Sequence, residues 1–292
     1  MGFLDSLKSG KFVILSEIDP SKGVDVSALF EIADHLKGRV DALNIADMPS
    51  AVMTMGSMAA SYLLKERGFD TIYNISCRDR NSLALQSDIL SASALGIENI
   101  FITKGEDITF GDHPNVKPVN DVSVDELFDI VKRLRDGFDA GNNALNGSPE
   151  LNVGAYVNCN AEKEELDLEI MELGKRVEQE ISFVITPAVF DLKLFEAFIK
   201  KVKHFNIPII AGIILLKTVG TARYLNKHID NVNVPDPIIE RLATAGDRLR
   251  ESIAITADLI SGMSDLCQGV NIMAMGWESK IPAFLEEVYA KI

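Results

Sequence analysis

Glu17 is the residue of this sequence best suited to acid–base chemistry. It lies in the segment Ser16-Glu17-Ile18-Asp19-Pro20, where a carboxylate ends an otherwise apolar run. Burial of a carboxyl group disfavours its charged form and raises its pKa toward values useful for proton transfer near neutral pH. We therefore expect Glu17 to act as a general acid, with a water-exposed position at a strand–loop junction as the structural alternative.

Two other segments are rich in hydrogen-bonding groups at points where apolar runs end. They cover residues 44–47 (Asn-Ile-Ala-Asp) and residues 74–81 (Asn-Ile-Ser-Cys-Arg-Asp-Arg-Asn). The second segment could hold a polyanion or a polar heterocycle. In the structural alternative, Asp79 caps the helix that follows, and Arg78 and Arg80 pair with carboxylates.

A fourth apolar run ends in Lys104-Gly105-Glu106 and leads into a long loop that contains residues 111–114 (Gly-Asp-His-Pro). Loops of this length usually cover ligands rather than simply connect two elements. Gly105 would let a cofactor approach the backbone closely, and Lys104 could neutralise a phosphate or an electron-rich ring. This segment therefore indicates a ligand at the end of the fourth strand.

The polar segments need a scaffold that brings the ends of several strands together. Short β-branched runs alternate along the chain with segments of helical period. The runs predict strands at residues 12–17, 41–46, 71–76, 99–104, 153–156, 182–186, 208–213 and 270–275. The periodic segments predict helices at about residues 25–37, 51–67, 82–95, 162–179, 191–203, 236–262 and 282–291.

Eight strands with helical segments between them predict an α/β fold, a closed (β/α)8 TIM barrel, which we expect to occupy residues 1–292 as a single domain. A doubly wound sheet with fewer strands is the alternative fold, and the strand count favours the barrel. No Pro-, Gly- or Ser-rich segment divides the sequence into halves. In a barrel, polar residues at the carboxyl ends of the strands face the ligand.

The chain is acidic, with 29 Lys and Arg against 43 Asp and Glu and a net charge of -14. Such a charge repels the phosphates of nucleic acids and anionic lipid surfaces. The amino terminus has no basic start followed by an apolar run, and no stretch approaches the roughly 18 apolar residues of a membrane span. We therefore expect no nucleic-acid partner, no membrane span and a cytoplasmic protein.

Several kinds of site are disfavoured by what the sequence lacks. The three cysteines, Cys77, Cys159 and Cys267, are far apart and lack the CxxC spacing of a zinc site, which indicates a reducing compartment without a disulfide framework. The four histidines are scattered, so no metal site is expected. The chain also lacks GxGxxG, GxxxxGK[ST], HExxH and GxSxG motifs, so nucleotide hydrolysis and serine-hydrolase chemistry lose support.

Taken in order, the strand-end motifs resemble methylenetetrahydrofolate reductase, most closely the short single-domain form of anaerobic bacteria. The resemblance spans nearly the whole chain. Its most specific segments are residues 16–20, 77–81, 111–114, 117–119, 211–213, 226–227 and 234–236. It implies a flavoprotein, with FAD or FMN, that reduces 5,10-methylenetetrahydrofolate to 5-methyltetrahydrofolate in one-carbon metabolism.

The resemblance also implies roles for individual residues. Glu17 matches the family's general acid, in agreement with the argument from burial. For the cofactor, Lys104 matches a basic position beside the flavin, Tyr156 a ring-stacking tyrosine, and Arg176 a lysine that contacts the cofactor phosphates. Asn74 matches a flavin-site position that is histidine in other members.

Two positions depart from the family pattern. Glu106 stands where the family usually has aspartate, and Pro187 stands where it usually has glutamine, both at positions that contact folate or tune the flavin. Glu106 keeps the charge but moves the carboxylate by about one methylene, and near-attack geometry tolerates little displacement. Pro187 removes a side-chain donor and an acceptor from the pterin site.

The resemblance implies a tetrahydrofolate-type substrate, an oligomer, and electrons that arrive through an iron–sulfur partner subunit. The chain itself has no cysteine cluster for such a centre. One alternative is a paralogue that serves as a non-catalytic binding subunit or acts on another pterin. A flavin-free aldolase or lyase is the other alternative, which the absence of a lysine at the end of the sixth strand disfavours.

Overall fold

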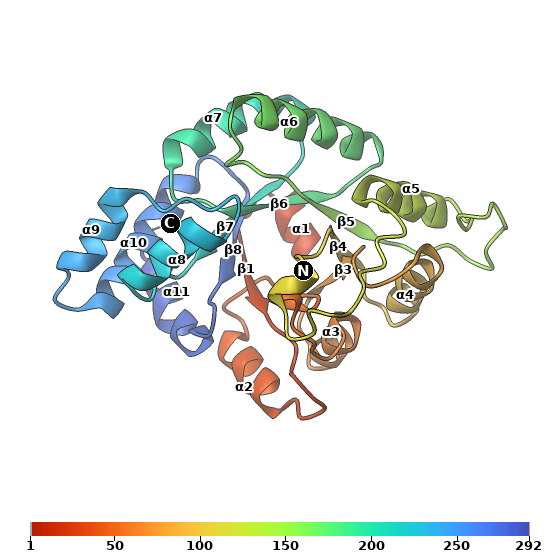
Figure 1. The fold of residues 1–292 in the computed structure, drawn as a ribbon, viewed down its shortest axis with the longest axis horizontal. Helices are drawn as coiled ribbons and strands as arrows, with labels where there is room; N and C mark the ends of the chain where they lie inside the picture. The colour runs from red at the N-terminus through yellow and green to blue at the C-terminus, as the bar shows by residue number, and fades with distance from the viewer. Residues whose placement is uncertain (1, 292) are drawn as a thin grey trace.

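The computed structural model describes residues 2–291 and contains a closed parallel barrel, as the alternation of strands and helices predicted (Figure 1). Each strand pairs with the next, and the eighth pairs with the first. The strands are β1 (Val13–Ile18), β2 (Ala42–Ile45), β3 (Thr71–Ser76), β4 (Asn99–Thr103), β5 (Asn152–Tyr156), β6 (Phe183–Ala188), β7 (Ile209–Ile214) and β8 (Gly269–Met273).

Helices surround this barrel. They are α1 (Phe3–Lys8), α2 (Ser27–Leu36), α3 (Ser57–Glu66), α4 (Ser82–Ala94), α5 (Val124–Arg135), α6 (Lys163–Glu178), α7 (Leu192–Val202), α8 (Val219–His228), α9 (Asp236–Thr244), α10 (Arg248–Met263) and α11 (Ile281–Tyr289). Four short 3-10 turns are η1 (Pro49–Ala51), η2 (Ile108–Phe110), η3 (Lys203–Phe205) and η4 (Glu278–Lys280). No helix within residues 2–291 is long and apolar enough to cross a membrane.

Two predicted helices differ from the structure. The predicted helix 236–262 is divided into α9 and α10, because the Asp247 side chain accepts from Arg250 N and starts a new helix after Gly246. The predicted helix 51–67 begins only at Ser57, since the preceding segment turns through the left-handed region, with φ of 56° at Ala51. The prediction also missed α1, α5 and α8.

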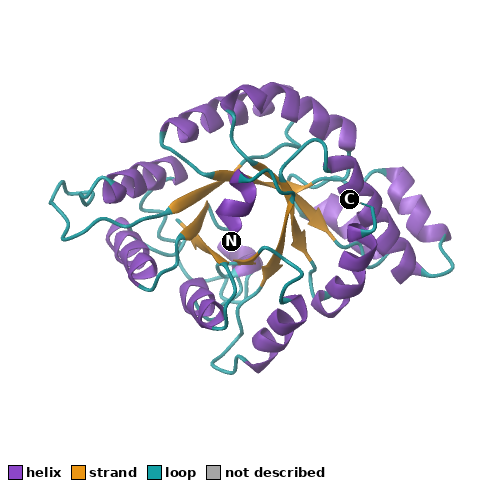
Figure 2. Cartoon of the chain, turned by 180° about the vertical axis from the view of Figure 1, so that it is seen from behind, coloured by secondary structure: helices purple, strands orange, loops and turns teal. Residues whose placement is uncertain are grey.

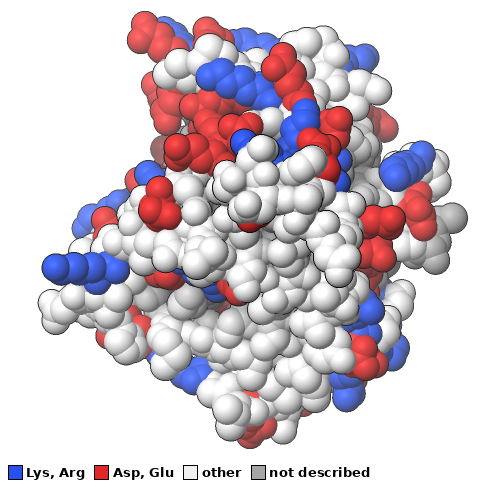
Figure 3. All heavy atoms as spheres, turned by 90° about the vertical axis from the view of Figure 1, so that its right-hand side faces the viewer, with Lys and Arg blue, Asp and Glu red and all other residues white. Residues whose placement is uncertain are grey.

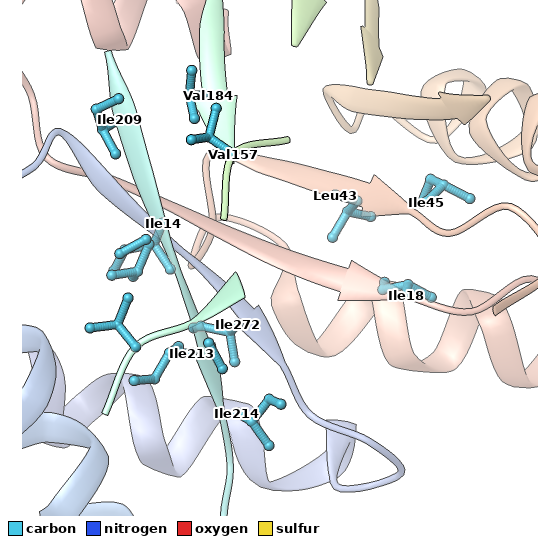
Figure 4. Packing of buried hydrophobic residues seen from close by; sticks show 14 of the residues in the cluster. Ile14, Ile18, Leu43, Ile45, Val157, Val184, Ile209, Ile213, Ile214 and Ile272 are labelled. Carbon is cyan, nitrogen blue, oxygen red and sulfur yellow. The ribbon is translucent and has the colours of Figure 1, made fainter. Parts of the chain in front are cut away.

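The outer faces of the strands pack against the helices. Side chains such as Ile14, Leu43, Ile213 and Ile272 point from the strands into this layer and are almost completely buried (Figure 4). Both faces of each strand are therefore covered, which explains why the strands are continuous apolar runs rather than alternating ones.

Helix α1 closes the amino-terminal end of the barrel, as the view from behind shows (Figure 2). Phe3 packs edge-on against Phe183 inside the barrel, with ring centroids 5.2 Å apart. Gly154 leaves room for this pair, because a Cβ there would overlap the Phe183 ring. The opposite, carboxyl end is left for the site.

Charges are unevenly distributed on the surface. On the side of the barrel that carries α4 and α5, acidic and basic side chains gather toward the edges and leave a broad uncharged area across the middle (Figure 3). Leu83 on α4 and Leu95 directly after this helix are exposed.

The strand registers place inward-facing residues from alternate strands in layers, as in other barrels of this type. The upper layer contains Glu17 of β1, Asn74 of β3, Tyr156 of β5 and Gly212 of β7. The layer beneath it contains Asn44, Phe101, Ile185 and Asn271 of the even-numbered strands. Polar side chains are thus concentrated at the carboxyl end of the barrel.

Candidate active site

Glu17 lies at the centre of the candidate site, near the carboxyl end of β1. Its Oε2 accepts from Asn271 Nδ2 at 3.2 Å and from Asn44 Nδ2 at 3.4 Å. Burial is the main cause that raises the pKa of Glu17 to about 7. The hydrogen bond from Asn271 lowers this pKa, and the charges of Asp19 and Glu106 raise it. The hydrogen bond from Asn44 lowers it weakly. A carboxyl group with this pKa can donate and accept a proton near neutral pH.

Three further carboxylates, Asp19, Glu106 and Glu278, lie around the mouth of the barrel near Glu17. The pKa of Asp19 is raised by burial first, and then by the charges of Glu278 and Glu106. The three acidic groups come from the loops after β1, β4 and β8, which the barrel brings together. The charges of Asp19 and Glu106 favour the protonated form of Glu17.

Arg78 and Arg80 form the ion pairs with carboxylates that the structural alternative for this segment predicts. Arg80 pairs with Asp47 at 2.8 Å and with Asp88 at 2.9 Å, and Arg78 pairs with the neighbouring Asp79 at 2.7 Å. These arginines are thus neutralised by carboxylates of the chain itself.

The cap of the following helix is a different residue from the one expected. Asn81, rather than Asp79, is the N-cap of α4, since its side chain accepts from Ala84 N at 3.0 Å. Asp79 is turned toward the Arg78 guanidinium instead.

Asp47 is the centre of a buried network at the end of β2. Besides Arg80, its carboxylate accepts from Ser76 N and Ser76 Oγ at 3.0 Å each and from Ser57 Oγ at 3.2 Å. The network ties the ends of β2 and β3 to the start of α3. It positions the loops around the site rather than presenting a free charge to a ligand.

The loop after β4 folds back over Arg78. Gly105 has φ of 82°, and a Cβ on it would lie only 2.9 Å from Arg78 Cβ. Arg78 Nη1 donates to the Glu106 carbonyl at 3.1 Å, and the Arg78 carbonyl accepts from Val119 N at 2.7 Å. Glu106 and Lys104 are both exposed near the mouth, and Glu106 Oε2 lies 3.9 Å from Arg78 Nη1.

The middle of this loop contacts the loops after β1 and β2. Asp112 accepts from Met53 N at 3.0 Å, pairs with His113 Nδ1 at 2.8 Å and forms an ion pair with Lys22. Gly111 packs against the carbonyl group of Ala51. Three βα loops therefore join into a cover beside the mouth.

The predicted flavin residues lie in different environments. Tyr156 is partly buried in the same barrel layer as Glu17, and its hydroxyl lies 3.5 Å from Asn231 Nδ2. Asn74 is buried, and its Oδ1 has no hydrogen-bond partner among residues 2–291. Both side chains belong to the upper layer of the barrel, at the carboxyl ends of β3 and β5.

Arg176 lies beneath this region on α6 and is buried. Its guanidinium donates to the Tyr156 carbonyl at 2.9 Å and to Asp125 and Glu172 at 3.1 Å each. A phosphate would have to replace these partners, so the predicted phosphate contact of Arg176 remains a prediction.

Pro187 interrupts the regular pairing of β6. The register of β6 against β7 shifts between Ile185 and Ala188, so Pro187 lies where the strand pairing is irregular. Proline has no N–H to donate, and a central strand accommodates it at such a point because this donor is not needed there. Gly212 lies opposite, and a Cβ on it would be 2.8 Å from the Pro187 carbonyl oxygen.

Asn271 and Asp19 are residues of the site to which sequence reasoning assigned no role. Asn271 is an amide within the apolar run of β8, and a polar residue inside a strand buried on both faces is the signal that could have identified it. Asp19 lies in the same segment as Glu17 but received no function from its type alone.

Other possible sites are not connected with the barrel mouth. A surface cavity of about 590 Å³ lies between α8 and α9, lined by Arg223, Asn226, Lys227, Asp236, Ile239 and Glu240. It contains none of the strand-end residues, so the chemistry is assigned to the mouth. Within residues 2–291, no group of three or more His, Cys, Asp or Glu residues could hold a metal ion.

Comparison with solved structures supports the fold alone. EDTA monooxygenase (EmoA) from Chelativorans sp. BNC1 matches with a TM-score of 0.56 at 11% identity, over 96% of this chain and 93% of that one. DmoA from Hyphomicrobium sulfonivorans matches with a TM-score of 0.57 at 9% identity, over 94% and 86% of the two chains. Tryptophan synthase from Mycobacterium tuberculosis matches with a TM-score of 0.56 at 11% identity, over 99% and 96%. Because these proteins differ in function, the barrel alone does not identify the reaction.

Sequence comparison is more specific. A probable methylenetetrahydrofolate reductase (NADPH) of Caenorhabditis elegans is 22% identical over 192 residues, which are 65% of this chain but only 27% of that protein. The chain thus matches about a quarter of the length of this curated relative. The family model for methylenetetrahydrofolate reductase matches residues 3–288. The chain therefore belongs to the methylenetetrahydrofolate reductase family of oxidoreductase enzymes, as its strand-end motifs indicated.

Proposed function

We propose that this protein catalyses the flavin-dependent reduction of 5,10-methylenetetrahydrofolate to 5-methyltetrahydrofolate, with Glu17 as the general acid. The observation that carries the proposal is a carboxyl group at the mouth of the barrel whose pKa is raised to about 7 in a member of this family. A general acid works best when its pKa lies near the operating pH.

The residues around the mouth fit a flavin in part. The buried Oδ1 of Asn74 has no partner among the described residues and could accept from a ring N–H, while Tyr156 offers an aromatic face and Lys104 an exposed positive charge. A bound reduced flavin would supply the hydride that the reaction requires. Arg176 would contribute indirectly, because it holds the backbone of Tyr156 in place.

Glu17 would donate its proton to a nitrogen of the imidazolidine ring of the folate. Protonation there helps the ring to open to the iminium, whose carbon accepts the hydride. Before the reaction, the negative charges of Asp19 and Glu106 favour the protonated form of Glu17. During the reaction, the same charges would stabilise the positive charge that develops on the substrate.

The electron source is proposed to be a partner subunit that contains an iron–sulfur centre. Cys77, Cys159 and Cys267 are all buried and do not form a cluster, so this chain offers no thiolate set for such a centre within residues 2–291. Reduction of the bound flavin by NADPH alone at a rate matching turnover would contradict a required partner.

The function is tested with the purified protein and added flavin. The protein should be yellow and should oxidise methyltetrahydrofolate with an artificial electron acceptor. Glu17→Gln should lower this rate by about 10²- to 10⁴-fold while flavin remains bound. Glu66→Gln, which changes an exposed carboxylate at the end of α3, is the matched control. A colourless protein that takes up neither FAD nor FMN would rule the proposal out.

A second candidate function is action on a different pterin, and the presence of Pro187 at the register shift of β6 is the observation that favours it. Proline offers no side-chain hydrogen bond to a pterin ring, and Glu106 extends its carboxylate farther than aspartate would. The double variant Pro187→Gln, Glu106→Asp distinguishes the two candidates. If methyltetrahydrofolate oxidation appears only in the double variant, the natural substrate is not this folate.

A further inference from the structure

Asn44 and Asn271 flank Glu17 on the two strands that neighbour β1. Both direct Nδ2 to the same carboxylate oxygen, Oε2, at 3.4 and 3.2 Å. The other oxygen, Oε1, makes no hydrogen bond to any of residues 2–291, and the side chain is only partly buried. The carboxyl group thus has one oxygen held by the barrel and one left toward the mouth.

Folding alone does not explain these two asparagines. Each is 1% exposed, and each has an Oδ1 without a hydrogen-bond partner among the described residues. A buried amide oxygen without a partner destabilises the folded state. The other two members of their layer, Phe101 and Ile185, are apolar, so an apolar side chain suits this depth of the barrel.

We propose that Asn44 and Asn271 are positioning residues for Glu17, which hold Oε2 against the barrel interior so that Oε1 presents the transferable proton to the substrate. The inference rests on the proposed role of Glu17 as the general acid. It assigns the two asparagines a function through Glu17 rather than through contact with flavin or folate.

The direction of their effect on Glu17 follows from the geometry. Each amide N–H favours the charged carboxylate, so its removal raises the pKa of Glu17 above about 7. The loss of Asn271, with the shorter bond, should act more strongly than the loss of Asn44. The charged groups that face Glu17, namely Asp19 and Glu106, are unchanged in either variant, as are Glu278 beside Asp19 and Arg78 beside Glu106.

The test uses Asn271→Leu and Asn44→Leu, since leucine has a similar size to asparagine but no donor. Titration of Glu17 is followed by NMR on protein with ¹³C-labelled glutamate carboxyl groups, with Glu17→Gln to assign the signal. We expect the pKa of Glu17 to rise by about one pH unit in Asn271→Leu, and by less in Asn44→Leu. The alkaline limit of the activity profile should move in the same direction while maximal turnover falls, and the melting temperature should not decrease.

Asn99→Leu is the matched control. Asn99 is also a buried asparagine facing the barrel interior, but its amide bonds Asp70 and the Thr71 carbonyl, far from Glu17. It should lower the melting temperature and leave the titration of Glu17 unchanged. An unchanged Glu17 titration in folded Asn271→Leu and Asn44→Leu would overturn the positioning role. This readout needs no turnover, so it remains informative even if the protein proves inactive on folates.

Discussion

Gly111 packs so closely against Ala51 that a Cβ on Gly111 would overlap the Ala51 carbonyl oxygen. The contact joins the loop after β4 to the loop after β2, beside the mouth of the barrel. Ala51 itself has φ of 56°, which is an unfavourable backbone conformation for a residue other than glycine. The cover beside the site therefore depends on a small residue at position 111.

Gly111→Ala should detach the long loop after β4 from its neighbour. Gly111 has φ of −87°, so the backbone tolerates alanine and only the contact with Ala51 is lost. We expect faster proteolysis within residues 105–122 and a turnover reduced by about tenfold or more, because small displacements of positioning loops reduce rates strongly. Gly23→Ala, at a glycine with open space around it, is the control. Equal proteolysis rates in the two variants would show that the contact does not hold the loop.

Glu17 should make the protein less stable as the pH rises. Its pKa is raised from 4.5 to about 7 in the folded state, so the stability it contributes is present below pH 4.5 and is lost as the pH rises through 7. At pH 8, Glu17→Gln should therefore unfold with a free energy larger by up to about 3 kcal/mol than the parent, with a much smaller difference at pH 4.5. Urea denaturation at the two pH values measures this. A difference independent of pH would mean that the carboxyl group is not desolvated.

The pair of Asp47 and Arg80 should be essential for folding stability. Arg80→Leu leaves the buried Asp47 carboxylate without its cation, and breaking a buried pair in this way destabilises by roughly 3–5 kcal/mol. Arg67→Leu breaks the ion pair with Asp34, which is about as short but more exposed, and should change stability by no more than about 1 kcal/mol through that pair. Denaturant midpoints of the two variants provide the comparison. Similar losses in both would contradict the central role of Asp47.

Lys104 should act on flavin affinity without acting on stability. Its side chain is exposed beside the mouth, and no ion pair joins it to another residue of 2–291. Lys104→Ala should weaken flavin binding by about tenfold, which corresponds to about 1.4 kcal/mol, measured by fluorescence titration. The melting temperature of the flavin-free protein should be unchanged. Lys200→Ala, at an exposed lysine near the end of α7, should alter neither property. Unchanged flavin affinity in Lys104→Ala would remove this lysine from the site.

Much of the barrel follows from local sequence. Strands such as β3, β4 and β7 coincide with β-branched apolar runs, because strands covered on both faces need apolar residues at consecutive positions. Helix α1 and the break at Gly246 could not be read in the same way. Helix α1 is held in place by the packing of Phe3 against Phe183. The break after Gly246 arises because the Asp247 side chain caps a new helix within a continuous helical pattern.

In the candidate site, too, some features follow from the sequence and others only from the tertiary structure. The residue types and order of the strand-end motifs determined by themselves the family and the candidate acid Glu17, because a carboxylate at the end of an apolar strand is recognisable without any partner. Only the tertiary structure decided that Asn271, 254 positions away, donates to Glu17, and that Arg176 turns inward to the backbone of Tyr156. The physical reason is that barrel closure pairs the first strand with the eighth, so the environment that raises the pKa of Glu17 is assembled from both ends of the chain.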